Sequence, residues 1–179
     1  VNADGHKKSI SAPGVGNYIT VNKALAAARK LVGDAALKRG GLVQAHGTGT
    51  PQNRVTESHI LNEAARLYGI EGWPVAAVKA YLGHSIGCAG ADQLINTLGC
   101  WQHGIVPGIA TIDHVADDVH ASHLDISPAH RELAAGASWA LVNAKGFGGN
   151  NATATVLSPG RTREMLEKRH GRDSMLAWE

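Results

Sequence analysis

The chain has 179 residues, of which 44% are hydrophobic and 18% charged, and its formal net charge is +2. This length and composition predict one globular domain with a sizeable core. The small net charge does not suggest a nucleic-acid surface, and no apolar run approaches the roughly 20 residues that span a bilayer. We therefore expect neither a nucleic-acid partner nor a membrane span.

The chain begins with Val1 in place of an initiator Met, which suggests a fragment or a processed chain. Its two cysteines, Cys88 and Cys100, have neither the spacing of a redox motif nor that of a disulfide framework. A reducing, cytoplasmic setting is the simpler interpretation. Cys88 stands at an expected helix start, where a thiol can be activated, but a small buried residue is favoured. Cys100 is expected in the core.

Apolar spacing predicts helices and strands that alternate along the chain. Helices are expected near residues 16–32, 54–68 and 87–102. Strands are expected at residues 42–45, 75–78, 105–106, 109–112, 139–143 and 152–157, the last two being paired. The stretch 113–130 is polar and loop-like. The alternation predicts an α/β layered domain with helices on both faces of the sheet.

The composition changes after Pro159, because residues 161–172 are mostly charged. We expect a main domain over residues 1–158 and a charged, helical C-terminal extension over residues 159–179. The extension is most simply a solvated helix, and docking of a partner is the alternative.

Two histidines stand where a predicted strand gives way to a loop. His46 opens the segment His-Gly-Thr-Gly-Thr-Pro, and His84 ends the segment Lys-Ala-Tyr-Leu-Gly-His. In α/β folds such strand ends meet at one edge of the sheet, where chemistry is usually found. The glycines and threonines around both histidines allow a substrate to come close. The sequence therefore predicts one reaction centre that contains both.

Two imidazoles can donate hydrogen bonds to a developing oxyanion, such as an enolate or a tetrahedral alkoxide. One of them can also shuttle a proton. Lys79, five residues before His84, is placed to fix its charge or tautomer, or to bind a carboxylate. Glu57, eleven residues after His46, can face back as the partner of Lys79. The alternative is that both histidines are ordinary surface residues.

A glycine-rich segment, Gly-Phe-Gly-Gly-Asn-Asn at residues 146–151, follows another predicted strand. It lacks the Gly-Lys-Ser/Thr ending of a phosphate loop, and a tight turn between paired strands is the alternative. At such a turn, the Phe147 ring would form a mobile aromatic wall of the site, and its backbone N–H would donate a hydrogen bond to an oxyanion. The histidines and aspartates between residues 103 and 130 lack metal-site spacing, so a solvated loop is favoured. No metal or cofactor is expected.

Together these segments resemble the C-terminal half of an elongating β-ketoacyl synthase of the type with two histidines. The His-Gly-Thr-Gly-Thr-Pro, Lys-x-x-x-Gly-His and Gly-Phe-Gly-Gly segments occur in the family's order and near its spacing, within residues 4–158. The resemblance implies the thiolase fold, in which two βαβαβαββ halves form an α-β-α-β-α layered body. This chain would be the second half.

The resemblance implies a decarboxylative Claisen condensation, in which a cysteine takes the acyl chain and malonyl on acyl carrier protein loses CO₂. His46 and His84 would hold the malonyl thioester carbonyl and stabilise the enolate. Lys79 would support His84 and pair with Glu57, while Phe147 would gate the acyl chain. The expected substrate-binding residues are Thr48, Thr50, Gly146 and Gly148.

The partners that the resemblance implies are malonyl-carrying acyl carrier protein, an acyl-ACP or acyl-CoA donor, and the N-terminal half that bears the cysteine. The complete enzyme would be a homodimer, and this chain alone would be inactive. One alternative is a non-catalytic partner of the chain-length-factor type, although such relatives often lose the histidines. Another is an unrelated binding module with a glycine-rich anion loop.

Several residues depart from the family pattern. Arg54 stands where an aspartate is usual, Cys88 where an alanine is usual, and Ala144-Lys145 where Ser-Phe is favoured. We expect Arg54 to change the ion pairing around Glu57. With the tail beyond Pro159, these departures indicate a divergent branch that resembles longer bacterial ketosynthases able to start fatty-acid synthesis from acetyl-CoA.

Overall fold

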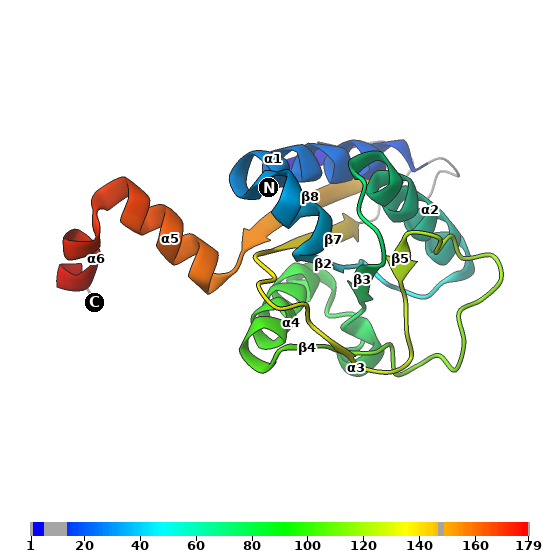
Figure 1. The fold of residues 1–179 in the computed structure, drawn as a ribbon. Helices are drawn as coiled ribbons and strands as arrows, with labels where there is room; N and C mark the ends of the chain where they lie inside the picture. The colour runs from blue at the N-terminus through cyan, green and yellow to red at the C-terminus, as the bar shows by residue number, and fades with distance from the viewer. Residues whose placement is uncertain (1, 6–13, 147–148, 179) are drawn as a thin grey trace.

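A mixed sheet forms the centre of the computed structural model, which describes residues 2–5, 14–146 and 149–178 (Figure 1). Its strand order is β1-β8-β7-β2-β3-β5. Strand β2 is parallel to β3 and β7, whereas β8 is antiparallel to β7 and β1. The bounds are β1 (Asn2–Gly5), β2 (Gly41–Gln44), β3 (Trp73–Ala76), β5 (Leu124–Asp125), β7 (Trp139–Gly146) and β8 (Asn150–Leu157). A separate small sheet pairs β4 (Ile105–Val106) with β6 (Arg131–Glu132).

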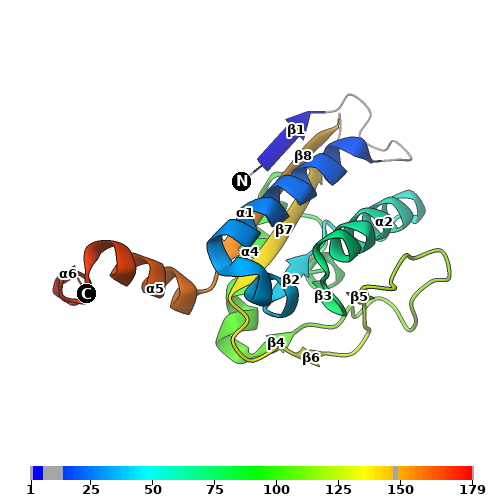
Figure 2. The same ribbon diagram turned by 45° about the horizontal axis from the view of Figure 1, so that its top comes forward.

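Helices cover both faces of this sheet (Figures 1 and 2). Helices α1 (Val15–Arg39) and α2 (Pro51–Tyr68) lie on one face, and α4 (Ala89–His103) lies on the other. A short helix, α3 (Lys79–Leu82), and the 3₁₀ turn η1 (Ile86–Cys88) connect β3 to α4. The longer elements follow the order β1-α1-β2-α2-β3-α4-β7-β8, which is the expected βαβαβαββ unit. The predicted α/β class is confirmed.

The central strands are apolar on both sides because helices cover both faces. Val43 and Leu141 are fully buried in the cluster formed with α1 and α2. Leu42 and Ala140 face the other way, against Cys100 of α4. The expected core position of Cys100 is confirmed, and burial raises the pKa of its thiol to about 11.

Some predicted boundaries were wrong. Helix α1 does not end near residue 32 but continues to Arg39 across a kink at Gly33, whose φ of 81° suits glycine. Residues 109–112 form a turn and not a strand, and the side chains of Ile109 and Ile112 line a cavity. The short helix α3 was not predicted, and β5 interrupts the stretch expected to be loop.

Two helices, α5 (Pro159–His170) and α6 (Arg172–Trp178), follow the last strand and project from the body (Figures 1 and 2). The Ser158 hydroxyl caps α5 by accepting a hydrogen bond from the Arg161 backbone N–H at 3.2 Å. Arg161 also donates to the Leu31 carbonyl of α1 at 2.7 Å. No helix in the described ranges has the length and apolarity needed to cross a membrane.

Candidate functional site

His46 and His84 meet at one edge of the sheet. The loop after β2 delivers His46, and the loop after α3 delivers His84. The two rings stand edge to face, with 5.3 Å between their centroids and an interplanar angle of 77°. His46 is buried and His84 is exposed. Both line a cavity of about 490 Å³, whose wall also includes Gly87, Lys145 and Asn151.

Backbone amides fix the orientation of both rings. The Lys145 N–H donates to His46 Nδ1 at 3.2 Å, and the Ile86 N–H donates to His84 Nδ1 at 3.0 Å. A nitrogen that accepts a hydrogen bond carries no proton, so the neutral form of each ring is protonated on Nε2. The site therefore presents two imidazole N–H donors.

The amide that holds His84 comes from a strained residue. Ile86 has a φ of 58°, the one positive value among the non-glycine residues of the described ranges. A β-branched side chain is strongly disfavoured there, at a cost of about 1–3 kcal/mol. Such strain is often found at functional sites, and here it turns the Ile86 N–H toward the His84 ring.

His46 is held as a neutral imidazole. Burial is the main cause that lowers its pKa to about 4, and the charge of Lys79 acts in the same direction. The charge of Glu57 opposes this shift but does not outweigh it. At neutral pH His46 therefore remains uncharged, as the hydrogen bond that its Nδ1 atom accepts from the Lys145 N–H requires.

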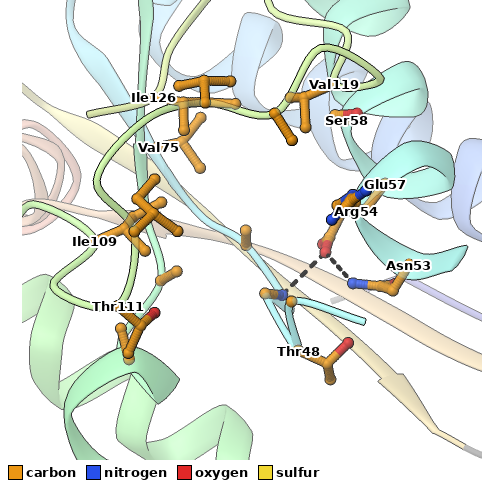
Figure 3. Close-up of a pocket in the computed structure, with 18 of the residues that line it drawn as sticks. Thr48, Asn53, Arg54, Glu57, Ser58, Val75, Ile109, Thr111, Val119 and Ile126 are labelled. Carbon is orange, nitrogen blue, oxygen red and sulfur yellow. Dashed lines mark hydrogen bonds between the residues drawn. The ribbon is translucent and has the colours of Figure 1, made fainter. Parts of the chain in front are cut away.

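Glu57 anchors the loop that carries His46. It lies on α2, which begins at Pro51, and its carboxylate is buried. One oxygen accepts from the His46 N–H at 2.7 Å and from Asn143 Nδ2 at 2.7 Å. The other accepts from the Gly47 N–H and from Asn53 Nδ2, both at 2.9 Å (Figure 3). Four donors around two oxygens require an ionised carboxylate.

The expected ion pair between Lys79 and Glu57 is absent. The Nζ atom of Lys79 is buried and has no hydrogen-bond partner among the described residues. The four donors above fill the hydrogen-bonding positions of Glu57, so its carboxylate has no free lone pair for Lys79. Burial lowers the pKa of Lys79, and the charge of Glu57 partly offsets this effect.

Lys145, Asn143 and Asn53 were not predicted as site residues. Asn143 and Lys145 are two residues apart on β7, so their side chains lie on the same side of the strand. Lys145 Nζ donates to Asn53 Oδ1 at 2.7 Å. Two of them had a signal in the sequence: Asn53 is one helical turn before Glu57, and Lys145 departs from the family pattern.

A second cavity, of about 380 Å³, shares Gly47 and Glu57 with the site (Figure 3). It lies between α2 and the segment 109–126, and its wall includes Ile109, Val119 and Ile126. Arg54 Nε and Nη2 of α2 bind the Asp118 carboxylate across this gap, with the shortest contact at 2.8 Å. Arg54 therefore ties the segment to the helix and does not pair with Glu57.

The remaining predicted residues are distributed between the two cavities. Thr48 lines the second cavity, with its hydroxyl 3.4 Å from that of Thr50. Gly146 lines the cavity of the histidines. Phe147 and Gly148 lie outside the described residues.

The favoured interpretation of Cys88 was wrong, because this residue is exposed. It belongs to a stretch, residues 81–88, in which every side chain is exposed. The packing expected around Cys88 is not made within the described part of the chain.

Comparison with known proteins agrees with this geometry. Residues 1–113 match the family described as "Beta-ketoacyl synthase, C-terminal domain". The β-ketoacyl-[acyl-carrier-protein] synthase FabY of Pseudomonas aeruginosa is 54% identical over 178 residues, which are 99% of this chain and 28% of that protein. The 3-oxoacyl-[acyl-carrier-protein] synthase 1 of Escherichia coli is 32% identical over 114 residues, 64% of this chain and 26% of that protein.

Solved structures give the same assignment. The crystal structure of the noncanonical ketosynthase FabY from P. aeruginosa superposes with a TM-score of 0.92 at 55% identity, covering 99% of this chain and 28% of that one. The ishigamide ketosynthase/chain length factor matches with a TM-score of 0.66 at 29% identity, covering 84% of this chain and 34% of that one. The chain spans little more than a quarter of FabY, and its fold is that of thiolase-type ketosynthases. This chain therefore belongs to the β-ketoacyl synthase family and corresponds to the C-terminal domain of its members.

Proposed function

We propose that the complete enzyme containing this chain condenses malonyl-ACP with an acyl thioester, and that this chain supplies the half of the site with two histidines. The observation that carries the proposal is the meeting of His46 and His84, each with Nδ1 occupied by a backbone amide. Both rings then offer Nε2–H to one acceptor. Two donors held in fixed orientations are suited to a developing oxyanion.

In this reaction the malonyl thioester carbonyl oxygen accepts hydrogen bonds from both Nε2–H groups. The bond to the carboxylate carbon breaks, CO₂ leaves, and the electron pair forms the enolate whose negative oxygen the histidines stabilise. The enolate carbon then attacks the acyl thioester on a cysteine of the N-terminal half. The resulting tetrahedral alkoxide collapses and expels the cysteine thiolate.

An exposed apolar face beside His84 is a suitable surface for the N-terminal half to pack against. Leu82, Ile86, Ile95 and Leu98, from α3, η1 and α4, expose 46–76% of their surface. Exposed apolar side chains that gather on one face mark interaction surfaces. We assign this face to the half that carries the cysteine.

The finer assignments follow from the family resemblance. Thr48, Thr50, Gly146 and Gly148 bind the substrate arm, Phe147 gates the acyl chain, and Lys79 supports His84. The carrier protein delivers malonyl, an acyl-ACP or acyl-CoA supplies the acyl group, and the complete enzyme is a homodimer. Residues 159–179 form an extension distinct from the condensing domain.

Replacement of His46 separates this function from that of a non-catalytic chain-length factor. In the complete enzyme, His46→Ala is expected to abolish formation of the β-ketoacyl product, measured by mass spectrometry of the carrier protein. His59→Ala is the matched control, because His59 and His120 form another edge-to-face pair, with centroids 4.9 Å apart, outside the histidine cavity. Unchanged condensation in His46→Ala would favour the non-catalytic alternative.

A further inference from the structure

The buried carboxylate of Glu57 needs a positive charge nearby. Glu57 is only 4% exposed, and its carboxylate accepts four hydrogen bonds from neutral groups. A buried carboxylate without a nearby cation is strongly disfavoured. The resemblance assigned this role to Lys79, but the ammonium group of Lys79 has no hydrogen-bond partner among the described residues.

Lys145 is placed to act instead. Its ammonium group donates to Asn53 Oδ1 at 2.7 Å, and Asn53 Nδ2 donates to the Glu57 carboxylate at 2.9 Å. The Asn53 amide thus connects the cation to the carboxylate and is polarised at both ends. Burial acts to raise the pKa of Glu57, but the charge of Lys145 is the largest influence that keeps the pKa below its usual value.

Lys145 also contacts His46 directly, because its backbone N–H donates to the Nδ1 atom of that ring. Glu57 holds the other end of the same residue through the His46 N–H. Lys145 therefore acts on His46 by two routes, one through its backbone and one through its charge.

We propose that Lys145 is a positioning residue for this site, the cation that balances Glu57 and thereby fixes the loop and the ring of His46. Lys145 stands where the family pattern favours an aromatic side chain. The inference rests on the proposed function only for its effect on catalysis. The interaction of Lys145 with Glu57, relayed by Asn53, stands without it.

The groups that act on Glu57 come from three other elements. Lys145 lies on β7, His46 on the loop after β2, and Lys79 on α3. Replacement of each lysine by methionine removes its charge and keeps most of its length. Lys79→Met is thus the matched control for Lys145→Met.

A double-mutant cycle on the complete protein tests the pairing without an activity assay. Lys145→Met, Glu57→Gln and the double variant are unfolded in urea at neutral pH, beside the same cycle with Lys79→Met. The folded-to-unfolded ratio should fall at least tenfold further with Lys145→Met in the wild type than in the Glu57→Gln background. Coupling no greater than that of the Lys79 cycle would overturn the proposal. If Lys145→Met does not fold, Lys145→Gln replaces it.

The pH profile of condensation tests the positioning role. Lys145→Met should move the acidic limb of kcat/KM to higher pH, because Glu57 then takes up a proton more readily. Lys145→Arg should restore the wild-type limb. An unmoved limb in Lys145→Met would refute the role. Failure of the proposed function has a different signature: the wild-type enzyme makes no β-ketoacyl product, while the unfolding cycle still reports the pairing.

Discussion

The rings of His46 and His84 lie edge to face, 5.3 Å apart between centroids, although the two residues are 38 positions apart in the chain. Each ring accepts a backbone N–H at Nδ1, so each directs an Nε2–H away from its anchor. Glu57 fixes the loop of His46, and the strained Ile86 fixes the ring of His84. The paired donors are thus products of the backbone conformation as much as of residue identity.

Glu57→Gln should destabilise the protein strongly. All four partners of the carboxylate are donors, so the new amide NH₂ must face at least one of them. Leaving buried donors unmatched and the charge of Lys145 unbalanced should cost about 3–5 kcal/mol of unfolding free energy. Urea unfolding measures this loss.

The matched control is Glu63→Gln, on the same helix. Glu63 is a more exposed carboxylate paired with Arg66, and it should change the unfolding midpoint little. Equal effects of the two substitutions would contradict the anchoring role of Glu57.

His46 should make stability depend on pH. Its folded pKa of about 4 lies below the ordinary histidine pKa of about 6.5, so between these values the unfolded state binds more protons. Stability from this group is complete above pH 6.5 and falls as the pH drops toward 4. The total loss is about 3 kcal/mol, since each pKa unit is worth about 1.4 kcal/mol.

Urea unfolding between pH 4 and pH 7 checks this slope. His46→Asn should remove it, whereas His120→Asn, at an exposed position, should leave it in place. A wild-type slope that survives in His46→Asn would show that another group causes it.

Arg54→Ala should loosen the segment over the second cavity. The Arg54–Asp118 contact joins α2 to this segment, and both side chains are at least 40% exposed, so global stability should change little. Hydrogen exchange of residues 114–120 should become faster. Two neighbouring hydrogen bonds should limit the change to this segment. The His120 N–H donates to the Ser58 hydroxyl, and the His123 N–H donates to Asn62 Oδ1. Unaltered exchange there would show that those hydrogen bonds suffice.

Gly41→Ala should damage the core. A Cβ atom at this position would lie 2.2 Å from the ring of Trp139, which is fully buried and donates to the Ala36 carbonyl. Overpacking of this kind costs about 1–3 kcal/mol or more. Thermal unfolding measures the effect. Gly99→Ala, on α4 with open space around it, should instead stabilise by about 0.5–1 kcal/mol, and a similar loss in both would contradict the steric explanation.

The sequence predicted the α/β layers and the convergence of the histidines, because apolar periodicity and strand ends are local signals. It did not predict α3 or the turn at residues 109–112, since tertiary packing decides those conformations. The ion pairing was the main error. Family resemblance assigned Lys79 to Glu57, whereas the donors that surround Glu57 come from elements far apart in the sequence. Their contacts depend on the register of β7 beside β2, which no short motif encodes.

The central claim is that His46 and His84 together stabilise an enolate oxygen. Release of CO₂ from malonyl-ACP labelled at the free carboxylate measures this step apart from the later attack on the acyl thioester. In the complete enzyme, His46→Gln and His84→Gln should each slow release by about 10²–10³-fold. His59→Gln should match the wild type. Release at the wild-type rate in either site variant would contradict the account.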